Sequence, residues 1–137
     1  MLIDNVREYY LNGGYNCAES VVRGANDYYQ LGLHDHDMKM IAAMGAGVQT
    51  GNFCGALAGA TCVLSMMFVV KQAHESTDIT TVTSALLSKF EAKNGTKLCA
   101  IIKPKMFVEG IRCLHTVELA CACLEEVIEE YSDLKKI

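Results

Sequence analysis

The sequence contains no tryptophan, only one proline and no Cys-x-x-Cys motif, although seven of its 137 residues are cysteine. The missing motif disfavours a thioredoxin-type dithiol and the zinc ribbons and fingers, which use ligand pairs close together in the sequence. A secreted disulfide framework fits no better, because the number of cysteines is odd and no basic-then-apolar leader precedes Asp4. We therefore expect a cytoplasmic protein whose cysteines are reduced.

Charge is scarce in two respects. The formal net charge is −4, and basic residues cluster only at Lys103–Lys105 and Lys135–Lys136, so the basic surface typical of nucleic-acid binding is missing. No charged side chain occurs between Met40 and Val70. The segment Phe53–Val70 reaches the minimum length of a membrane span, but it is rich in Gly, Ala, Ser and Thr, which favours a buried central helix instead.

The sequence also lacks the alternating pattern expected of a β-strand. Apolar residues recur every three or four positions, which predicts amphipathic helices. The predicted helices cover about residues 2–12, 16–31, 38–44, 53–74, 77–94, 96–104 and 110–134. Asn16 and Glu19 form a capping-box pattern at the second of these. We predict one all-α domain over residues 1–137, a bundle of about six or seven helices around a Gly/Ala-rich central helix.

Three cysteines fall within the first turn of a predicted helix, namely Cys17, Cys54 and Cys99. The free N–H groups and the positive dipole end of a helix favour a thiolate, so we expect a lowered pKa at these positions. Cys113 is a fourth candidate, because the cationic residue Arg112 precedes it. These four cysteines are the predicted catalytic residues.

The other three cysteines are expected to pack in the core or to be half-buried. Cys121 lies in the apolar stripe of the last predicted helix, where a free cysteine acts as a small apolar residue. Cys123 is about 160° from Cys121 around the helix, which makes the two a poor chelating pair. Cys62 lies about 12 Å from Cys54 along the central helix, too far for one metal ion to join them.

Glycines recur at every fourth position at Gly47, Gly51, Gly55 and Gly59. One ridge of the central helix is therefore almost free of side chains, so that a neighbouring backbone or a ligand can come close to the turn that carries Cys54. Close helix packing is the simpler interpretation of this pattern. If a cofactor is present, Gly55 and Gly59 are the candidate residues for binding it.

These motifs resemble those of a known family. The matching residues are Gly14-Tyr15-Asn16-Cys17-Ala18-Glu19-Ser20, Cys54-Gly55-Ala56-x-x-Gly59-Ala60, Thr96-Lys97-Leu98-Cys99 and Cys113. Together they are similar to the C_GCAxxG_C_C family of small proteins, which is named for its cysteines and described as redox-active. The resemblance covers nearly the whole chain and implies that its cysteines are Cys17, Cys54, Cys99 and Cys113. This sequence departs from the family pattern in having Leu114 instead of proline after Cys113, and three additional cysteines.

Three functions remain open at this stage. In the first, which we favour, at least two of the four cysteines cycle between dithiol and disulfide as in a thiol-dependent oxidoreductase, with a redox partner protein or a small-molecule thiol or oxidant as partner. In the second, Cys17, Cys54, Cys99 and Cys113 bind zinc or an iron–sulfur cluster. In the third, the chain is a non-catalytic helical scaffold, which could form a homo-oligomer.

Overall fold

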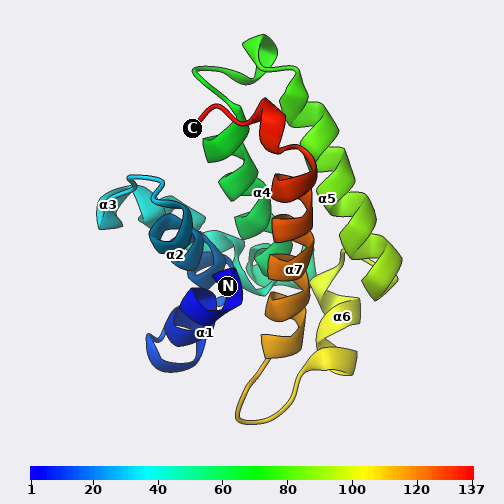
Figure 1. The fold of residues 1–137 in the computed structure, drawn as a ribbon. Helices are drawn as coiled ribbons and strands as arrows, with labels where there is room; N and C mark the ends of the chain where they lie inside the picture. Colours follow the sequence, from blue (N-terminus) through cyan, green and yellow to red (C-terminus); the bar gives the residue numbers. More distant parts are fainter.

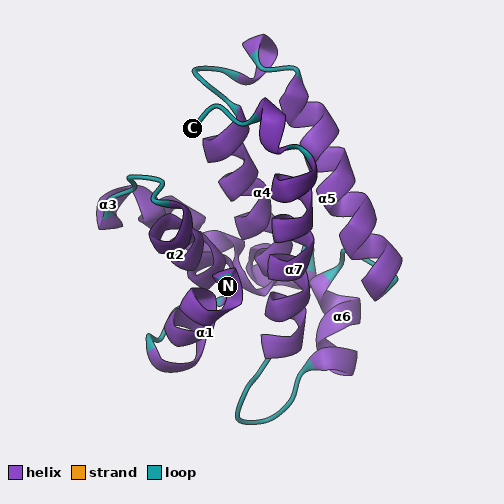
Figure 2. Cartoon of the chain, in the orientation of Figure 1, coloured by secondary structure: helices purple, strands orange, loops and turns teal.

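Seven α-helices and four short helical turns form the regular structure of the chain, and no strand is present (Figure 2). The structure, a computed structural model, describes residues 1–137. The α-helices are α1 (Leu2–Asn12), α2 (Cys17–Tyr29), α3 (Asp35–Met38), α4 (Gly55–Phe68), α5 (Asp78–Asn94), α6 (Cys99–Met106) and α7 (Leu114–Glu130). The short turns are η1 (Lys39–Met44), η2 (Gly47–Gly51), η3 (Ala73–Glu75) and η4 (Ser132–Leu134). The predicted all-α fold is confirmed.

The helices form two groups (Figure 1). In the first, α4, α5 and α7 run side by side, and each of them packs on the other two. In the second, α1 and α2 pack on each other; α2 also packs on α4, and α1 packs on α7. The helix α4 is therefore central, as its composition predicted, and α6 lies near the start of α7.

A continuous apolar core joins the two groups. Its largest fully buried side chains include Phe68, Phe90, Leu57, Leu64 and Leu86. Burying one such side chain contributes about 1.5–3 kcal/mol to the free energy of unfolding. This core holds the helices in place without any disulfide, because all seven cysteines are free thiols.

The capping box predicted at α2 is present. The side chain of Asn16 accepts the N–H of Glu19 at 2.9 Å, and the carboxylate of Glu19 accepts the N–H of Asn16 at 3.0 Å. This arrangement satisfies two of the N–H groups that a helix leaves free at its start. It fixes the first residue of α2 as Cys17.

Several predicted boundaries differ from the observed ones, and two of the differences have a clear physical cause. The central helix ends at Phe68 instead of near residue 74, because Val69 adopts an extended conformation with φ −109° and ψ 129°. The last helix begins at Leu114 instead of near residue 110. The segment before it turns back on itself, with Gly110 at φ 91° and Arg112 at φ 53°, and such left-handed residues interrupt a helix.

The backbone is left-handed between Ala46 and Gln49, where four consecutive residues have φ between 51° and 63°. A left-handed conformation costs an L-residue about 1–2 kcal/mol, so the surrounding structure must hold this turn in place. The Gln49 side chain helps by donating a hydrogen bond to the carbonyl of Gly45 at 2.9 Å. At Gly47 a Cβ atom would lie 2.6 Å from the Cβ of Cys99. The turn therefore lies directly against the start of α6.

None of the helices combines the length and apolar character that a membrane crossing requires. The uncharged stretch from Met40 to Val70 is divided among η1, η2 and the 14-residue helix α4.

Candidate functional site

Each of the four cysteines selected from the sequence lies at the start of an α-helix. Cys17 and Cys99 are the first residues of α2 and α6, and Cys54 and Cys113 immediately precede α4 and α7. For Cys113 this position was not predicted, because the helix was expected to begin earlier. Helix starts carry backbone N–H groups without an acceptor inside the helix, and these can face a sulfur atom.

Backbone contacts hold the starts of α4 and α6 next to each other. Phe53 and Leu98 form an isolated antiparallel bridge. Next to it, the N–H of Cys54 donates to the carbonyl of Lys97 at 2.8 Å, and the N–H of Cys99 donates to the carbonyl of Asn52 at 2.7 Å. Two cysteines that are 45 residues apart in the sequence are thus held at one place by the backbone.

Glycines bring α2 against the first turns of α4. A Cβ atom on Gly55 would lie 2.6 Å from the Sγ atom of Cys17, and a Cβ atom on Gly59 would lie 2.7 Å from the carbonyl oxygen of Ala18. Neither position leaves room for a side chain. The close approach predicted at Cys54 is therefore confirmed, although only Gly55 and Gly59 of the four spaced glycines belong to α4.

Tyr10 of α1 fixes the position of Cys113. Its hydroxyl accepts the N–H of Cys113 at 2.9 Å. Its ring lies 4.0 Å below the guanidinium of Arg112, which also donates a hydrogen bond to the carbonyl of Tyr10. These contacts keep Arg112 in its left-handed conformation and direct the chain into α7 at Cys113.

The four cysteines line one small cavity of about 20 Å³. The other residues around it are mainly apolar, and they include Ile102, Val117 and the first turn of α4. Cys54 is 5% exposed, whereas Cys17, Cys99 and Cys113 are half-buried. A cavity of this size accommodates about one water molecule. The four segments thus meet at one largely enclosed point.

A polar atom without a partner lies in the same wall. Thr116 lines the cavity and is 2% exposed, and its hydroxyl has no hydrogen-bond partner. A buried hydroxyl without a partner costs about 1–3 kcal/mol. One water molecule in the cavity could bind both this hydroxyl and a thiol.

Burial, and not the helix ends, dominates the ionisation of these thiols. It raises the pKa of Cys54 to about 12, although the backbone N–H groups of Leu57 and Ala56 lower it in part. Burial also raises the pKa of Cys99 and the pKa of Cys113. The predicted lowering of the pKa is therefore wrong for these three cysteines, because desolvation of the thiolate outweighs the favourable field at the helix starts.

Cys17 and Cys99 each interact electrostatically with all of the other three thiols. A thiolate at Cys17 raises the pKa of Cys54, the pKa of Cys99 and the pKa of Cys113, in each case after the larger effect of burial. A thiolate at Cys99 has a similar effect at Cys54 and Cys113. Such mutual repulsion requires the sulfur atoms to be close to one another.

The arrangement of the four thiols gives no support to a metal site. No group of three or more His, Cys, Asp or Glu side chains has an arrangement that could hold a metal ion. The zinc and iron–sulfur alternatives therefore have no support in this geometry. The assignment of Gly55 and Gly59 to cofactor binding stays a prediction; in the structure their α-carbons face α2.

The remaining cysteines lie outside the cavity. Cys121 and Cys123 are fully buried in the core, as predicted. Cys62 is exposed, so the prediction that it would be at least half-buried is wrong. It lies beside an apolar groove of about 510 Å³ that is lined partly by methionines, including Met38 and Met66.

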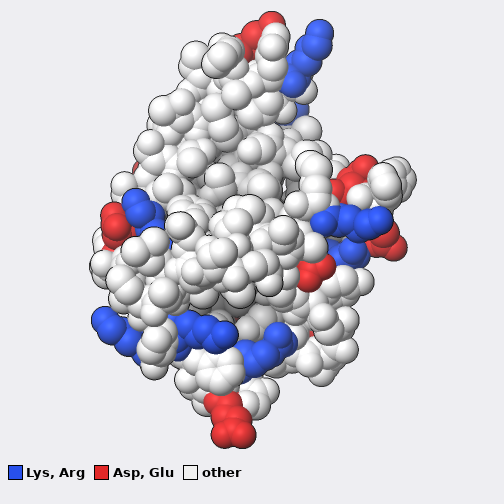
Figure 3. Space-filling model, turned by 180° about the vertical axis from the view of Figure 1, so that it is seen from behind, with Lys and Arg blue, Asp and Glu red and all other residues white.

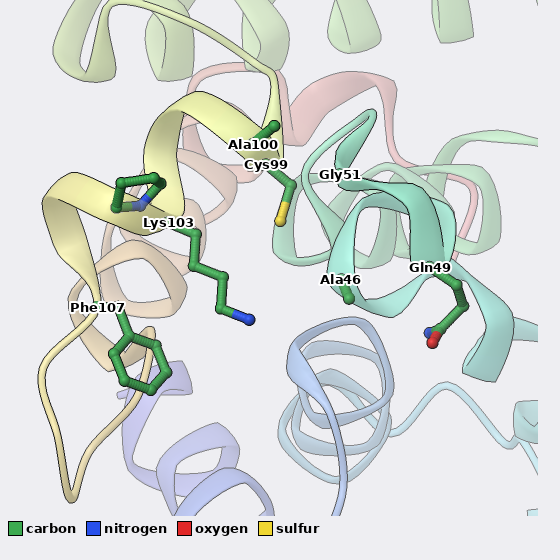
Figure 4. A pocket seen from close by; sticks show the side chains of 8 residues that line it. Ala46, Gln49, Gly51, Cys99, Ala100, Lys103 and Phe107 are labelled. Atoms are coloured by element: carbon green, nitrogen blue, oxygen red, sulfur yellow. The ribbon is translucent and has the colours of Figure 1, made fainter.

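An open hollow of about 590 Å³ adjoins the thiol cavity (Figure 4). It lies between α6 and the left-handed turn, and its wall includes Ala46, Gln49 and Phe107. Cys99 and Lys103 belong to both the hollow and the thiol cavity. Figure 4 shows the Cys99 sulfur and the Lys103 ammonium group both pointing into the open space.

Sequence reasoning did not identify Tyr10, Lys103 or Thr116 as parts of this site. Lys103 stands four residues after Cys99, the spacing of neighbours on a helix face, and this was the one signal available for it. Tyr10 and Thr116 have no comparable signal, because their roles depend on how α1 and α7 pack.

Comparison with known proteins agrees with the cysteine pattern. The sequence model of the family described as "Putative redox-active protein (C_GCAxxG_C_C)" matches residues 15–127. This range includes all four cysteines of the cavity. No curated protein and no solved structure gave a significant match. The chain belongs to the C_GCAxxG_C_C family of redox-active proteins.

Proposed function

We propose that this protein is a thiol-dependent oxidoreductase in which two of Cys17, Cys54, Cys99 and Cys113 cycle between dithiol and disulfide. The observation that carries the proposal is the single cavity lined by all four. They come from four separate segments, so simple packing of neighbours in the sequence does not account for their meeting.

The reaction transfers two electrons. Two thiols lose two protons and two electrons and form one sulfur–sulfur bond, and an oxidant, either a disulfide of a partner protein or a small molecule, takes up the electrons. Cys17 and Cys99 are the central candidates for the pair, because each of them interacts with all of the other three thiols. A small, mainly apolar cavity with room for only about one water molecule protects such a pair from side reactions.

The raised pKa values bear on the direction of the reaction. A low-pKa thiol stabilises the reduced state as a thiolate and makes the disulfide more oxidising. Burial raises the pKa of Cys54, the pKa of Cys99 and the pKa of Cys113, so ionisation of any of these three thiols gives the reduced state no such stabilisation at pH 7. We therefore expect the disulfide to be more reducing than one formed from low-pKa thiols.

Thiol counting tests the proposal. The reduced protein should have seven free thiols in denaturant, and mild oxidation of the native protein should remove two of them. Peptide mapping should find both within the set Cys17, Cys54, Cys99 and Cys113. A disulfide that involves Cys121 or Cys123, or seven thiols that persist after oxidation, would contradict the proposal.

A control separates this reaction from oxidation at the surface. Cys62 is the exposed thiol and can join two molecules through an intermolecular disulfide. The measurements are therefore repeated on Cys62→Ser, which has one thiol fewer and should still lose two thiols while remaining free of disulfide-linked dimers.

A further inference from the structure

The hollow beside the thiol cavity has only one charged residue in its wall. Among the eight residues that line it, Lys103 alone carries a charge. The wall opposite α6 comes from the uncharged stretch between Met40 and Val70, so no carboxylate faces the ammonium group. The volume of about 590 Å³ lies in the range of small-molecule sites.

The ammonium group of Lys103 has no partner within the protein. The ion pairs of the chain do not include it. Its neighbour is the ring of Phe107, whose centroid is 5.6 Å from the Nζ atom. Lys97, by contrast, lies 3.8 Å from Glu91.

Positive charge accumulates around this end of the molecule, although the whole chain is acidic. Between Cys99 and Cys113 the sequence contains three basic residues and one acidic residue. Figure 3 shows lysine and arginine side chains across the lower part of the rear face, at the end where α6 lies in Figure 1. This field attracts small anions towards the hollow.

Cys99 connects the hollow to the other thiols. It is half-buried, lines both spaces and points its sulfur into the hollow (Figure 4). Cys54, by contrast, is 5% exposed and is absent from the wall of the hollow. A molecule in the hollow would therefore meet Cys99 first.

We propose that the hollow binds a small disulfide that carries a carboxylate, which pairs with the Lys103 ammonium group while the Cys99 sulfur attacks the disulfide bond. The proposal rests on the dithiol function proposed above and adds its substrate class and its first reacting thiol. The phenyl ring of Phe107 and the small side chains of the hollow would contact the apolar part of the molecule.

The steps balance as a thiol–disulfide exchange. Cys99 loses its proton to solvent and its sulfur bonds to one sulfur of the substrate, whose second half leaves as a thiolate and takes up a proton. Cys17, deprotonated in turn, attacks the Cys99 sulfur and releases the first half of the substrate as a second thiol. The protein dithiol is oxidised to one disulfide, and the substrate disulfide is reduced to two thiols.

A series of three disulfides that differ in charge tests the inference. Reduced Cys62→Ser protein is mixed with 3,3′-dithiodipropionate, 2-hydroxyethyl disulfide or cystamine, which are anionic, neutral and cationic. Each rate of thiol loss is divided by the rate at which the same disulfide reacts with 2-mercaptoethanol. This correction accounts for differences in the intrinsic reactivity of the three disulfides. We expect the corrected rate to be at least tenfold higher for the anionic than for the neutral disulfide, and lowest for cystamine.

Two lysine variants locate the effect. Lys103→Gln should abolish the preference for the anionic disulfide, and because Lys103 is exposed the change should leave the circular dichroism spectrum unaltered. Lys105→Gln removes an equal charge two residues along α6, outside the hollow, and should keep most of the preference. Equal loss in both variants, or none in Lys103→Gln, would overturn the proposal.

A trapping variant identifies the first reacting thiol. In Cys17→Ser the second step is blocked, so mass spectrometry should find the mixed disulfide on Cys99. Its presence on Cys54 or Cys113 instead would overturn the inference. If the neutral disulfide removes two thiols as fast as the anionic one, the substrate class is wrong but the dithiol function stands; if none of the three removes a pair, the dithiol function itself fails.

Discussion

The helix α7 carries cysteines of two kinds. Cys113 precedes its first turn, is half-buried and lines the thiol cavity, whereas Cys121 and Cys123 lie in its middle and are fully buried in the core. Burial raises the pKa of Cys113 and the pKa of Cys121 alike. The pKa therefore does not distinguish a cysteine of the thiol cavity from a cysteine packed in the core.

The two kinds of cysteine differ in their position along α7. Cys113 has a backbone N–H that binds the Tyr10 hydroxyl and lies at a place where three other segments also begin helices. Cys121 is surrounded by the apolar side chains of neighbouring helices. One region brings thiols together and leaves an access route, and the other isolates them.

The largest expected effect comes from adding a side chain at Gly55, where α2 and α4 are in close contact. In Gly55→Ala the new Cβ atom would lie 2.6 Å from the Cys17 sulfur and 2.8 Å from the carbonyl oxygen of Met44. We expect the free energy of unfolding to fall by about 3 kcal/mol, as for overpacked cores, in urea denaturation. Gly110→Ala has open space around it and should lose only about 1–2 kcal/mol from its left-handed backbone; a smaller loss for Gly55→Ala than for Gly110→Ala would show that α2 can move away.

The next effect separates the two kinds of cysteine directly. Cys121→Ser buries a hydroxyl in an apolar environment and should lower the free energy of unfolding by about 1–3 kcal/mol. It should nevertheless still lose two thiols on oxidation. Because Cys113 is only half-buried, Cys113→Ser should lower the free energy of unfolding by less. Unfolding curves and thiol counts on both variants provide the check, and equal stability losses would remove the distinction.

A pH series tests the burial of Cys54. Below about pH 9 its thiol is protonated in both states; above it, the unfolded chain loses the proton, whereas the folded protein keeps it because burial raises the pKa to about 12. The free energy of unfolding should therefore fall between about pH 9 and pH 12, by about 1.4 kcal/mol per pH unit for this thiol. Urea denaturation of reduced protein at pH 8–10.5 measures the slope.

The variant Cys54→Ala isolates this contribution. Other groups also titrate in the same range, so the quantity of interest is the difference between the two slopes. This difference should approach the contribution of one thiol, about 1.4 kcal/mol per pH unit. Identical slopes would mean that Cys54 is solvated in solution.

The smallest expected effect concerns the hydroxyl of Thr116. Thr116→Val replaces an unpartnered, buried hydroxyl by a methyl group of similar size and should raise the free energy of unfolding by about 1 kcal/mol. Thermal or urea unfolding provides the measurement. A loss of stability would instead reveal a partner for the hydroxyl, such as a water molecule in the cavity.

The local features of this structure can be predicted from the sequence. Asn16 and Glu19 predict the start of α2, and the cysteine motifs predict the family. Each of these signals depends on residues close together in the chain. The fold class follows from them because helical periodicity repeats along the whole sequence.

The remaining part depends on contacts between distant segments. The start of α7 was missed because the left-handed conformation of Arg112 is held by Tyr10, about a hundred residues away. The raised pKa of Cys54 was missed because desolvation is a property of the assembled cavity. The same limitation applies to Lys103. Its lack of an ion-pair partner depends on the uncharged wall that lies opposite α6 in the folded protein.

The contact between Tyr10 and Cys113 has a consequence for how the family unit is defined. The match to the family begins at residue 15, so α1 (Leu2–Asn12) lies outside it, yet α1 supplies the hydroxyl that binds the Cys113 N–H. A fragment cut at the limits of the match would keep every cysteine of the motif and lose one of the supports of the fourth. The structural support of the thiol cavity therefore extends beyond the residues that define the family.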